Sequence, residues 1–293
     1  MPDLYLDFDG RQLRVRTDVP EVHDHIARVH APMLVPEVTR LVGDLLVDAV
    51  PGGHRMRGAS ELTLQGRADD LFIHIKADII YQMITSRPDL LWLHAGAVEK
   101  DGVAVVVSGP PGRGKSTLVT LLARAGWRLM SDDVLALDMC ADVVVPFPQL
   151  PNPRVFPGRE VTGDDFYALQ RELAVMPAEA FHRERTRLGA VIFPCFQPGA
   201  EPDLVRRRPG EGALDMLRNC VNVADHKAAA VARAAGLARV VPMYSLTYGV
   251  AASAVDQIQR LLDSVLVHAA SMCDGVGPAV ASLPPKPTPS EST

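Results

Sequence analysis

The sequence lacks the features that mark membrane-bound, secreted or nucleic-acid-binding proteins. It has no run of about 18 uncharged apolar residues, so we expect no membrane span. Residues Met1 to Tyr5 have neither the basic start nor the apolar core of a signal peptide. The net charge is −5, so electrostatics give no reason to propose nucleic acid as a partner. These absences favour a cytoplasmic protein with neither a membrane nor a nucleic acid as partner.

Cysteine is scarce, and its spacing does not suggest a metal site. The four cysteines are Cys140, Cys195, Cys220 and Cys273. No two of them form a C-x-x-C pair, so we expect no zinc site and four buried or inert thiols in a reducing compartment. Three nearby histidines, His23, His25 and His30, lack a carboxylate-rich helical frame, and we expect structural or surface roles for them.

The pattern of apolar and turn-forming residues predicts an α/β protein in three parts. Residues 1–75 are expected to form a small α+β module without a chemical motif, residues 76–273 a larger domain, and residues 274–293 a disordered tail. The expected elements of the module are a β-hairpin over Leu4–Val15, helices over Pro20–His30 and Pro36–Val50, and strands over Glu61–Leu64 and Leu71–Ile75. The expected helices of the larger domain are Asp78–Ser86, a helix after residue 116, Gly212–Ala235 and Ala252–His268. Its expected strands are Leu90–Val98, Val103–Ser108, Arg128–Leu137, Val143–Val145, Ala190–Phe193, Leu204–Arg206 and Val240–Tyr248.

One run of residues carries a specific chemical signal. It consists of Gly109, Pro110, Pro111, Gly112, Arg113, Gly114, Lys115 and Ser116, followed by Thr117. The run fits G-x-x-x-x-G-K-[ST], the phosphate-binding P-loop, and it lies between a predicted strand and a predicted helix. Such a loop directs backbone N–H groups and the helix dipole toward an anion. We therefore predict that Lys115 reaches the β- and γ-phosphates of ATP and that Ser116 holds Mg²⁺; the alternative is a flexible glycine turn.

Two adjacent carboxylates follow the loop helix. Asp132 and Asp133 end an apolar segment, where unpaired charges are costly unless they have a function. A Mg²⁺ ion beside the loop would offset that cost, with one Asp coordinating the ion and the other accepting a proton from an attacking hydroxyl. The alternative is an Asp pair that caps a turn.

A single histidine lies in the apolar segment that precedes the loop strand. This residue, His94, belongs to a segment expected to pair antiparallel with Val103–Ser108 across the Asp101-Gly102 turn. Taken alone, such a histidine is typical of a core or edge position.

In combination these motifs resemble one family. The stretch from His94 through the loop to the Gly126-Trp127 pair and Asp133 is similar to HPr kinase/phosphorylase and its kinase relatives, and weaker resemblance extends over residues 70–270. The resemblance implies a P-loop kinase core akin to the nucleotide domain of phosphoenolpyruvate carboxykinase, acting with ATP and Mg²⁺ on a serine hydroxyl. It implies catalytic roles for Asp132 and Asp133, with Asp132 favoured as base and Asp133 as metal ligand. It also places His94 near the γ-phosphate.

The sequence departs from that family in three places. Thr117 stands where HPr kinases usually carry Glu, the glycine-rich segment used for their phosphorylase reaction is missing, and residues 1–75 differ from their N-terminal domain. The chain is therefore more similar to stand-alone HPr-kinase-like kinases, some of which modify peptides, and HPr itself is not the expected acceptor.

Several arginines are candidate clamps for phosphate or for an acidic acceptor. They are Arg154, Arg159 and the run Arg206-Arg207-Arg208. Arginine binds phosphate and carboxylate oxygens in a bidentate manner, but each of these residues is also compatible with a solvated surface.

Three functions stay open at this point. The first is an ATP-dependent kinase that modifies a serine of a peptide or protein, the second is a kinase for a small-molecule hydroxyl on the same fold, and the third is an ATP-binding switch that transfers no phosphate. The sequence leaves the oligomeric state open, a homo-oligomer included.

The loop assignment predicts the effect of one substitution. Lys115→Ala deletes the cation at the β- and γ-phosphates and is expected to weaken ATP binding by about ten-fold or more. Isothermal titration with ATP measures this, with Lys227→Ala as the matched control. Unchanged ATP affinity in a folded Lys115→Ala protein would exclude the loop as the phosphate site.

Overall fold

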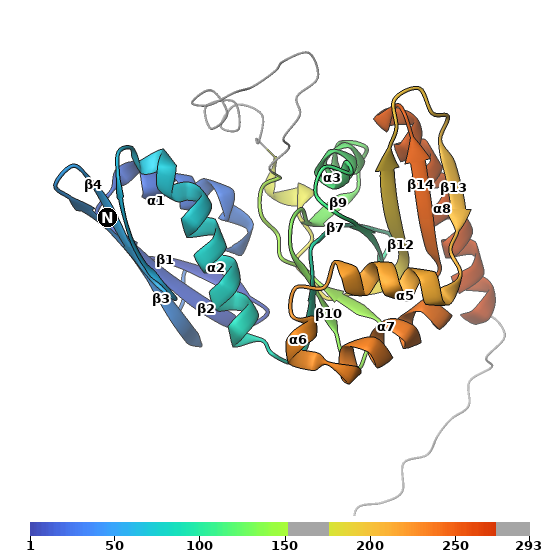
Figure 1. The fold of residues 1–293 in the computed structure, drawn as a ribbon, viewed down its shortest axis with the longest axis horizontal. Helices are drawn as coiled ribbons and strands as arrows, with labels where there is room; N and C mark the ends of the chain where they lie inside the picture. The colour runs from blue at the N-terminus through green and yellow to red at the C-terminus, as the bar shows by residue number, and fades with distance from the viewer. Residues whose placement is uncertain (152–175, 274–293) are drawn as a thin grey trace, which may run out of the picture.

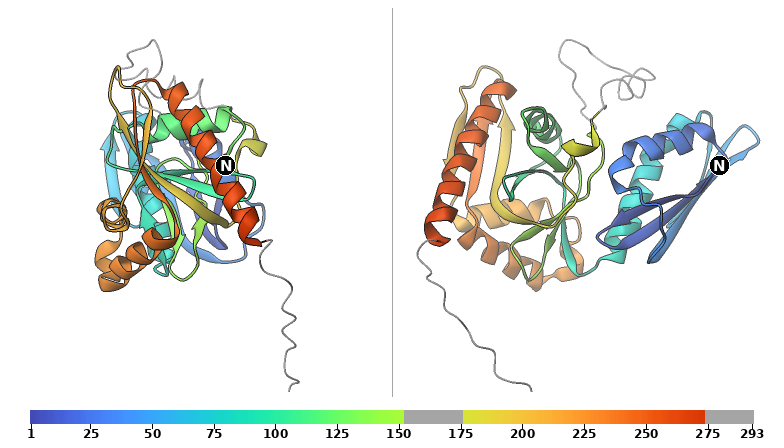
Figure 2. Two further views of the ribbon diagram at one scale, coloured as in Figure 1. Left: turned by 90° about the vertical axis from the view of Figure 1, so that its right-hand side faces the viewer. Right: turned by 180° about the vertical axis from the view of Figure 1, so that it is seen from behind.

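The computed structural model describes residues 1–151 and 176–273, and it shows a mixed α/β protein with two β-sheets. The candidate clamps Arg154 and Arg159 and the tail predicted over 274–293 lie outside the described residues. Figure 1 shows an N-terminal unit beside a larger C-terminal unit, and Figure 2 shows both from the side and from behind. Within the described residues, we find no helix with the length and apolarity needed to cross a membrane.

The N-terminal unit is a five-stranded sheet covered on one face by two helices (Figure 1). Its strands, which lie in sequence order, are β1 (Leu4–Phe8), β2 (Arg11–Thr17), β3 (Leu41–Val50), β4 (Gly53–Arg57) and β5 (Glu61–Gln65). Strands β1 and β2 pair antiparallel around Asp9 and Gly10, which both have positive φ, so the predicted hairpin is confirmed. The helices are α1 (Pro20–Val29), which was predicted, and α2 (Phe72–Ser86).

Two element predictions for this unit are wrong. The segment predicted as a helix over Pro36–Val50 contains β3 instead, where Leu45 and Val47 are buried at the two-residue spacing of a strand that pairs with β2. The segment predicted as a strand over Leu71–Ile75 begins α2. The predicted boundary between residues 75 and 76 therefore falls inside a helix.

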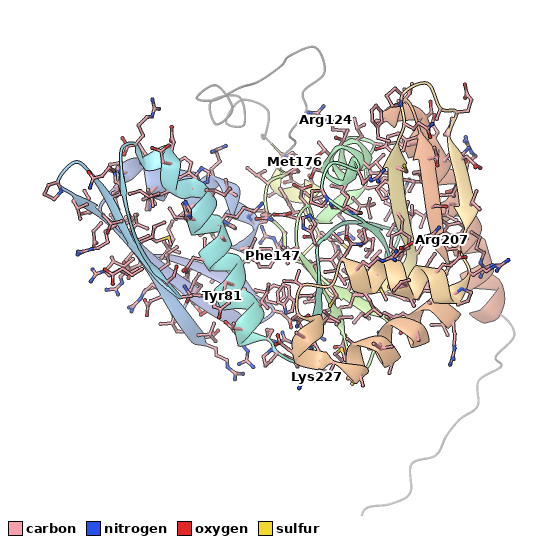
Figure 3. The ribbon with its side chains drawn as sticks, in the orientation of Figure 1. Tyr81, Arg124, Phe147, Met176, Arg207 and Lys227 are labelled. Atoms are coloured by element: carbon pink, nitrogen blue, oxygen red, sulfur yellow. The ribbon has the colours of Figure 1, made fainter. Side chains whose placement is uncertain are left out.

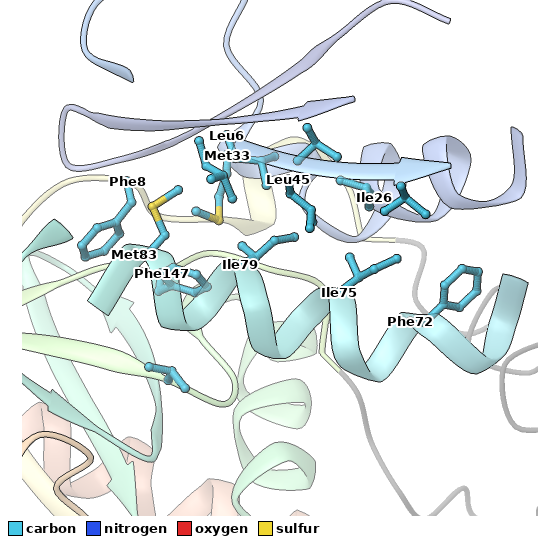
Figure 4. Packing of buried hydrophobic residues seen from close by; sticks show 14 of the residues in the cluster. Leu6, Phe8, Ile26, Met33, Leu45, Phe72, Ile75, Ile79, Met83 and Phe147 are labelled. Carbon is cyan, nitrogen blue, oxygen red and sulfur yellow. The ribbon is translucent and has the colours of Figure 1, made fainter. Parts of the chain in front are cut away.

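Helix α2 packs on the sheet through one face. Phe72, Ile75, Ile79 and Met83 recur at spacings of three and four residues, are buried, and point toward the strands (Figure 4). The side-chain amide of Gln82 donates a hydrogen bond to the Asp44 carbonyl of β3 (3.1 Å), which fixes the helix along the sheet. The opposite face of α2 is exposed at Ile73 and Tyr81.

The C-terminal unit is built on a nine-stranded sheet. Its strands are β6 (Leu90–Leu93), β7 (Ala95–Lys100), β8 (Val103–Ser108), β9 (Arg128–Ser131), β10 (Leu135–Asp138), β11 (Val143–Val145), β12 (Thr186–Phe196), β13 (Asp203–Arg206) and β14 (Met243–Tyr248). The main path runs β6-β10-β11-β12-β8-β7-β9, and β14 joins β12 to β13. Strands β8, β12 and β14 are parallel, so their carboxyl ends share one edge.

Helices cover both faces of this sheet. They are α3 (Lys115–Arg124), α5 (Pro209–Arg218), α6 (Val223–His226), α7 (Ala228–Val240) and α8 (Ala251–Cys273). On β8, Val103, Val105 and Val107 pack in the cluster that contains α3 and α8, while Ala104 and Val106 pack in the cluster that contains α5 and α7. Burial on both faces explains why this strand is continuously apolar.

The single helix predicted over Gly212–Ala235 is divided into three. The break lies at Asn222, which is 5% exposed and replaces helical hydrogen bonds with bonds to β6. Its side-chain amide donates to the Leu90 carbonyl (3.0 Å), and its side-chain oxygen accepts from the Trp92 N–H (2.9 Å). A positive φ at Lys227 separates α6 from α7.

A shared core joins the two units. The Phe8 ring of β1 lies 4.8 Å from Trp92 of β6 and 5.4 Å from Phe147, as measured between ring centroids. Figure 3 labels Phe147 between the units. Ion pairs add to this contact, because Asp9 pairs with both Arg87 and Arg185. The N-terminal unit is thus packed against the C-terminal unit through buried aromatic residues.

This packing predicts the effect of a cavity in the shared core. Phe147→Ala is expected to lower the free energy of unfolding by about 3–5 kcal/mol, because a fully buried ring is lost. Urea denaturation followed by circular dichroism measures the loss. Tyr81→Ala is the control, since Tyr81 is 58% exposed on α2 and its loss should cost less than about 0.5 kcal/mol. Equal destabilisation by the two variants would contradict the shared core.

Candidate functional site

The predicted phosphate-binding loop connects β8 directly to α3. Gly112 has a φ of 81° and Gly114 a φ of 90°, conformations that favour glycine, and α3 begins at Lys115. The strand, loop and helix predicted from the sequence are therefore confirmed as elements. Backbone N–H groups at the start of a helix lack helical partners, so this loop is arranged to receive an anion.

Two contacts shape the loop. The Lys115 ammonium, which is nearly buried, donates hydrogen bonds to the carbonyls of Gly109 (2.7 Å) and Pro110 (3.1 Å). A side chain at Gly114 would collide with the hydroxyl of Tyr248, at the end of β14. Burial raises the pKa of Tyr248 to about 12, so this hydroxyl stays protonated beside the loop. Gly114 is therefore required both by its φ and by its close neighbour.

His94 and the Asp pair lie at two breaks between strands, one between β6 and β7 and the other between β9 and β10. Strand pairing places these two breaks beside each other. Leu93 of β6 faces Leu135 of β10, and Ala97 of β7 faces Ser131 of β9, so the pairs that flank the break share one register. The register of β7 and β9 shifts beyond it, between Ala97 and Val98. His94 separates β6 from β7, and residues 132–134 separate β9 from β10.

The same register places this break beside the phosphate loop. Ala95 pairs with Ser108, the last residue of β8, so the predicted antiparallel pairing of the His94 segment with the loop strand is confirmed. The His94 N–H donates a hydrogen bond to the Asn219 carbonyl (2.8 Å), so the backbone at the break between β6 and β7 is bonded to the residue that follows α5. A Cβ at Gly96 would collide with the Val119 side chain of α3 and crowd the carbonyls of Ser131 and Asp132.

Asp133 is held between two basic side chains. Its Oδ1 lies 3.2 Å from Nδ1 of His94, and its Oδ2 lies 2.7 Å from Nζ of Lys76 on α2. Burial raises the pKa of the Asp133 carboxyl, but the hydrogen bond with His94 and the charge of Lys76 lower it by more, so the pKa lies well below its usual range. Asp133 is therefore ionised and well suited to a cation. Asp132 is almost completely buried, with 2% of its surface exposed.

These groups surround one cavity of about 270 Å³. Its lining residues are Lys76, His94, Pro111, Gly112, Gly114, Lys115, Ser116, Thr117, Asp132, Asp133, Phe196, Tyr248 and Ala251. The structure thus brings together the loop, the Asp pair and His94, which the sequence treats as three separate signals. Of the predicted loop residues, Gly109, Pro110 and Arg113 do not line the cavity.

Four lining residues were missed by the sequence analysis: Lys76, Phe196, Tyr248 and Ala251. Lys76 is the first residue of the predicted larger domain and belongs to no motif, and its position follows from the packing of α2. Phe196 and Tyr248 end the parallel strands β12 and β14, and their rings are 5.6 Å apart. The signal that could have identified Phe196 and Tyr248 is their position at the carboxyl ends of parallel strands, where ligands bind in α/β proteins.

The remaining candidates lie apart from the cavity. Arg207 forms an ion pair with Asp215 of α5, and the run of three arginines contributes no lining residue. The His25 ring stacks on Phe72 at 3.6 Å, and His30 is buried. Cys140, Cys195 and Cys220 are free thiols, and Arg113 donates to the Cys195 sulfur (3.3 Å).

The oxygen donors of the cavity suit Mg²⁺, which needs few protein ligands, better than they suit a metal ion that is coordinated entirely by side chains. In residues 1–151 and 176–273 no group of three or more His, Cys, Asp and Glu side chains is arranged to hold a metal ion. The cavity instead offers the Ser116 hydroxyl and the Asp132 and Asp133 carboxylates. Mg²⁺ prefers such oxygen ligands and takes the rest of its shell from water and substrate phosphates.

Comparison with known proteins gives a distant likeness among solved structures. No protein-family model matches the chain. No curated protein matches it either. Among solved structures, the chain is similar to the Hpr(Ser) kinase/phosphatase from Coxiella burnetii, with 12% sequence identity and a TM-score of 0.25 over 63% of this chain and 99% of that one. At this TM-score and identity the likeness carries no information about function.

The contact between Gly114 and Tyr248 gives a prediction specific to this loop. Gly114→Ala is expected to lower the melting temperature and weaken ATP binding, because the new Cβ meets the Tyr248 hydroxyl at a positive φ. Adding Tyr248→Phe removes that oxygen and should restore part of both. Differential scanning fluorimetry and ATP titration measure the two effects.

The control is Gly102→Ala, which has a similar φ of 77° but no atom within 4 Å of the new Cβ. If Gly114→Ala were no more damaging than Gly102→Ala, the close packing of Tyr248 on the loop would be wrong.

Proposed function

We propose that the chain is an ATP-dependent phosphotransferase with a P-loop kinase core of the HPr kinase and phosphoenolpyruvate carboxykinase type. It transfers the γ-phosphoryl group to a hydroxyl, that of a serine in a peptide or protein. The observation that carries the proposal is the placement of Lys115 and Ser116 across one cavity from Asp132 and Asp133. A phosphate-binding loop that faces two carboxylates provides both the site for the nucleotide and the groups for transfer.

The nucleotide is assigned to the loop and to the aromatic residues behind it. The triphosphate would lie on the N–H groups of residues 112–116, and Lys115 would exchange the carbonyls of Gly109 and Pro110 for phosphate oxygens. Phe196 is 48% exposed at the cavity and offers a ring face on which a base can stack. We therefore place the adenine beside Phe196.

The Asp pair is assigned two different tasks. The acceptor oxygen forms a bond to the γ-phosphorus, the bond to the ADP oxygen breaks, and the hydroxyl proton passes to a carboxylate. The low pKa of Asp133 makes it a weak proton acceptor, so Asp132 is assigned as the base. Ser116 and Asp133 would hold Mg²⁺, which neutralises charge on the phosphates when bound. His94 would keep Asp133 oriented.

The size of the cavity favours a large acceptor. The cavity of about 270 Å³ is lined by the phosphate loop and the Asp pair, so the phosphates of the nucleotide would take up its volume first. A serine side chain carried on a peptide can enter from outside while the rest of the peptide stays on the surface. This argument favours a peptide or protein over a free metabolite.

A direct assay tests the proposal. The purified protein is incubated with Mg²⁺ and [γ-³²P]ATP, first alone and then with a library of serine-containing peptides, and labelled peptides are identified by mass spectrometry. Transfer to serine that is lost in Lys115→Ala supports the proposal. Transfer only to small-molecule hydroxyls, or ATP binding without any transfer, would contradict it in favour of the two other functions.

The assignment of the Asp pair predicts different behaviour for the two residues. Asp132→Asn is expected to slow transfer by about 10²–10⁴-fold with ATP affinity largely kept, because the proton acceptor is lost. Asp133→Asn should also slow transfer but should recover partly at high Mg²⁺ or with Mn²⁺, because it weakens the metal shell. Single-turnover kinetics at several metal concentrations separate the two.

Asp101→Asn, in the exposed β7–β8 turn, is the matched control and should transfer phosphate normally. Wild-type rates for both Asp132→Asn and Asp133→Asn would show that the pair is structural.

A further inference from the structure

One cation of the site comes from the N-terminal unit. Lys76 belongs to α2, which packs on the small sheet, yet its ammonium lies 2.7 Å from Asp133 of the C-terminal unit. Its side chain is 23% exposed and lines the cavity that contains the phosphate loop. The cavity is therefore completed by both units.

The position of Lys76 is built into the fold. Phe72, Ile75, Ile79 and Met83 anchor α2 on the sheet (Figure 4). Lys76 follows Ile75 on this anchored helix and lines the cavity. The Asp78 carboxylate accepts hydrogen bonds from Gln82 (2.5 Å) and from the Ser60 N–H (3.3 Å), so the next acidic group of the helix is already engaged within its own unit. Lys76 consequently pairs with an acid from the other unit.

The ion pair between Lys76 and Asp133 occupies a carboxylate that is also assigned to the metal ion. Asp133 has two oxygens, one near His94 and the other near Lys76. A divalent ion that binds this carboxylate competes with the ammonium, because two cations at one oxygen repel each other. Lysine is a point charge on a flexible four-carbon stem, so it can move a few ångströms while the helix stays in place. The nearest new partners would be phosphate oxygens in the same cavity.

We propose that Lys76 is a mobile cation of the active site: it neutralises Asp133 until Mg²⁺ binds there, and it then contacts the γ-phosphoryl group during transfer. This inference rests on the proposed function and adds a residue to it. It also gives the N-terminal unit a direct part in the chemistry, since removal of α2 would remove the cation. Charge that develops on the transferred phosphoryl group is stabilised by such preplaced cations.

The proposal predicts two effects of opposite sign in one variant. Lys76→Met keeps the length of the side chain and removes its charge. Without the competing ammonium, Mn²⁺ should bind the ADP complex about ten-fold more tightly than in the wild type. At saturating metal, phosphoryl transfer to a serine peptide should nevertheless be slower by about 10²-fold, because the γ-phosphoryl group has lost a cation. Lys76→Arg should restore weak metal binding and part of the rate.

The experiment uses the full-length chain and two readouts. Electron paramagnetic resonance of free Mn²⁺, with ADP present, gives metal affinity without turnover, and single-turnover assays give the transfer rate. Lys100→Met is the matched control, because Lys100 bonds Gln259 (2.9 Å) and lies over Trp127, away from the cavity. Circular dichroism and melting temperature establish that each variant is folded.

Each outcome decides a part of the proposal. Equal Mn²⁺ affinity in Lys76→Met and wild type overturns the competition for Asp133, and a wild-type transfer rate overturns the contact with the phosphoryl group. A lower melting temperature with both readouts unchanged would show that Lys76 only ties the units together. If the wild type binds nucleotide but transfers no phosphate to any acceptor, the proposed function fails, while the Mn²⁺ titration still decides whether Lys76 competes with metal.

Discussion

The site depends on two adjacent breaks in the larger sheet, one between β6 and β7 and the other between β9 and β10. Strands β6 and β7 bend at His94, strands β9 and β10 break at residues 132–134, and one register relates the two breaks. Regular pairing would send these side chains to alternate faces of the sheet and bury their charges among apolar residues. The interruption releases His94, Asp132 and Asp133 from the ladder at the edge where β8 enters the phosphate loop. The rest of the C-terminal unit holds that edge in place.

Pairing with opposite charges and with carbonyl groups explains how so many charges can lie together. Asp133 is compensated by His94 and Lys76 at hydrogen-bond distance, and Lys115 is compensated by carbonyls of its own loop. Ion pairs of this kind contribute little to stability, since desolvation cancels most of the attraction. They are better understood as a site that exchanges partners when a charged ligand enters.

The sequence predicted what is local and missed what depends on packing. The β8 strand, the loop, α3 and the β7–β8 hairpin were all predictable, because glycines, an Asp-Gly turn and a continuous apolar run specify them. The helix wrongly predicted over Pro36–Val50 and the single helix over Gly212–Ala235 failed because partners distant in the chain decide them: β2 for the first and β6 for the second. Lys76 could not be predicted for the same reason, since its role appears only once α2 is placed against Asp133. The roles of Asp132, Asp133 and His94 in catalysis remain predictions.

The central claim is that one cavity holds the γ-phosphate between Lys115 and the Asp pair. A crystal structure with Mg²⁺ and a non-hydrolysable ATP analogue tests it most directly. The account predicts the triphosphate on the loop N–H groups, the metal bound by Ser116 and Asp133, and Lys76 moved from Asp133 to the γ-phosphate. A nucleotide bound elsewhere, or a γ-phosphate remote from Asp132 and Asp133 with the Lys76–Asp133 pair intact, would contradict it.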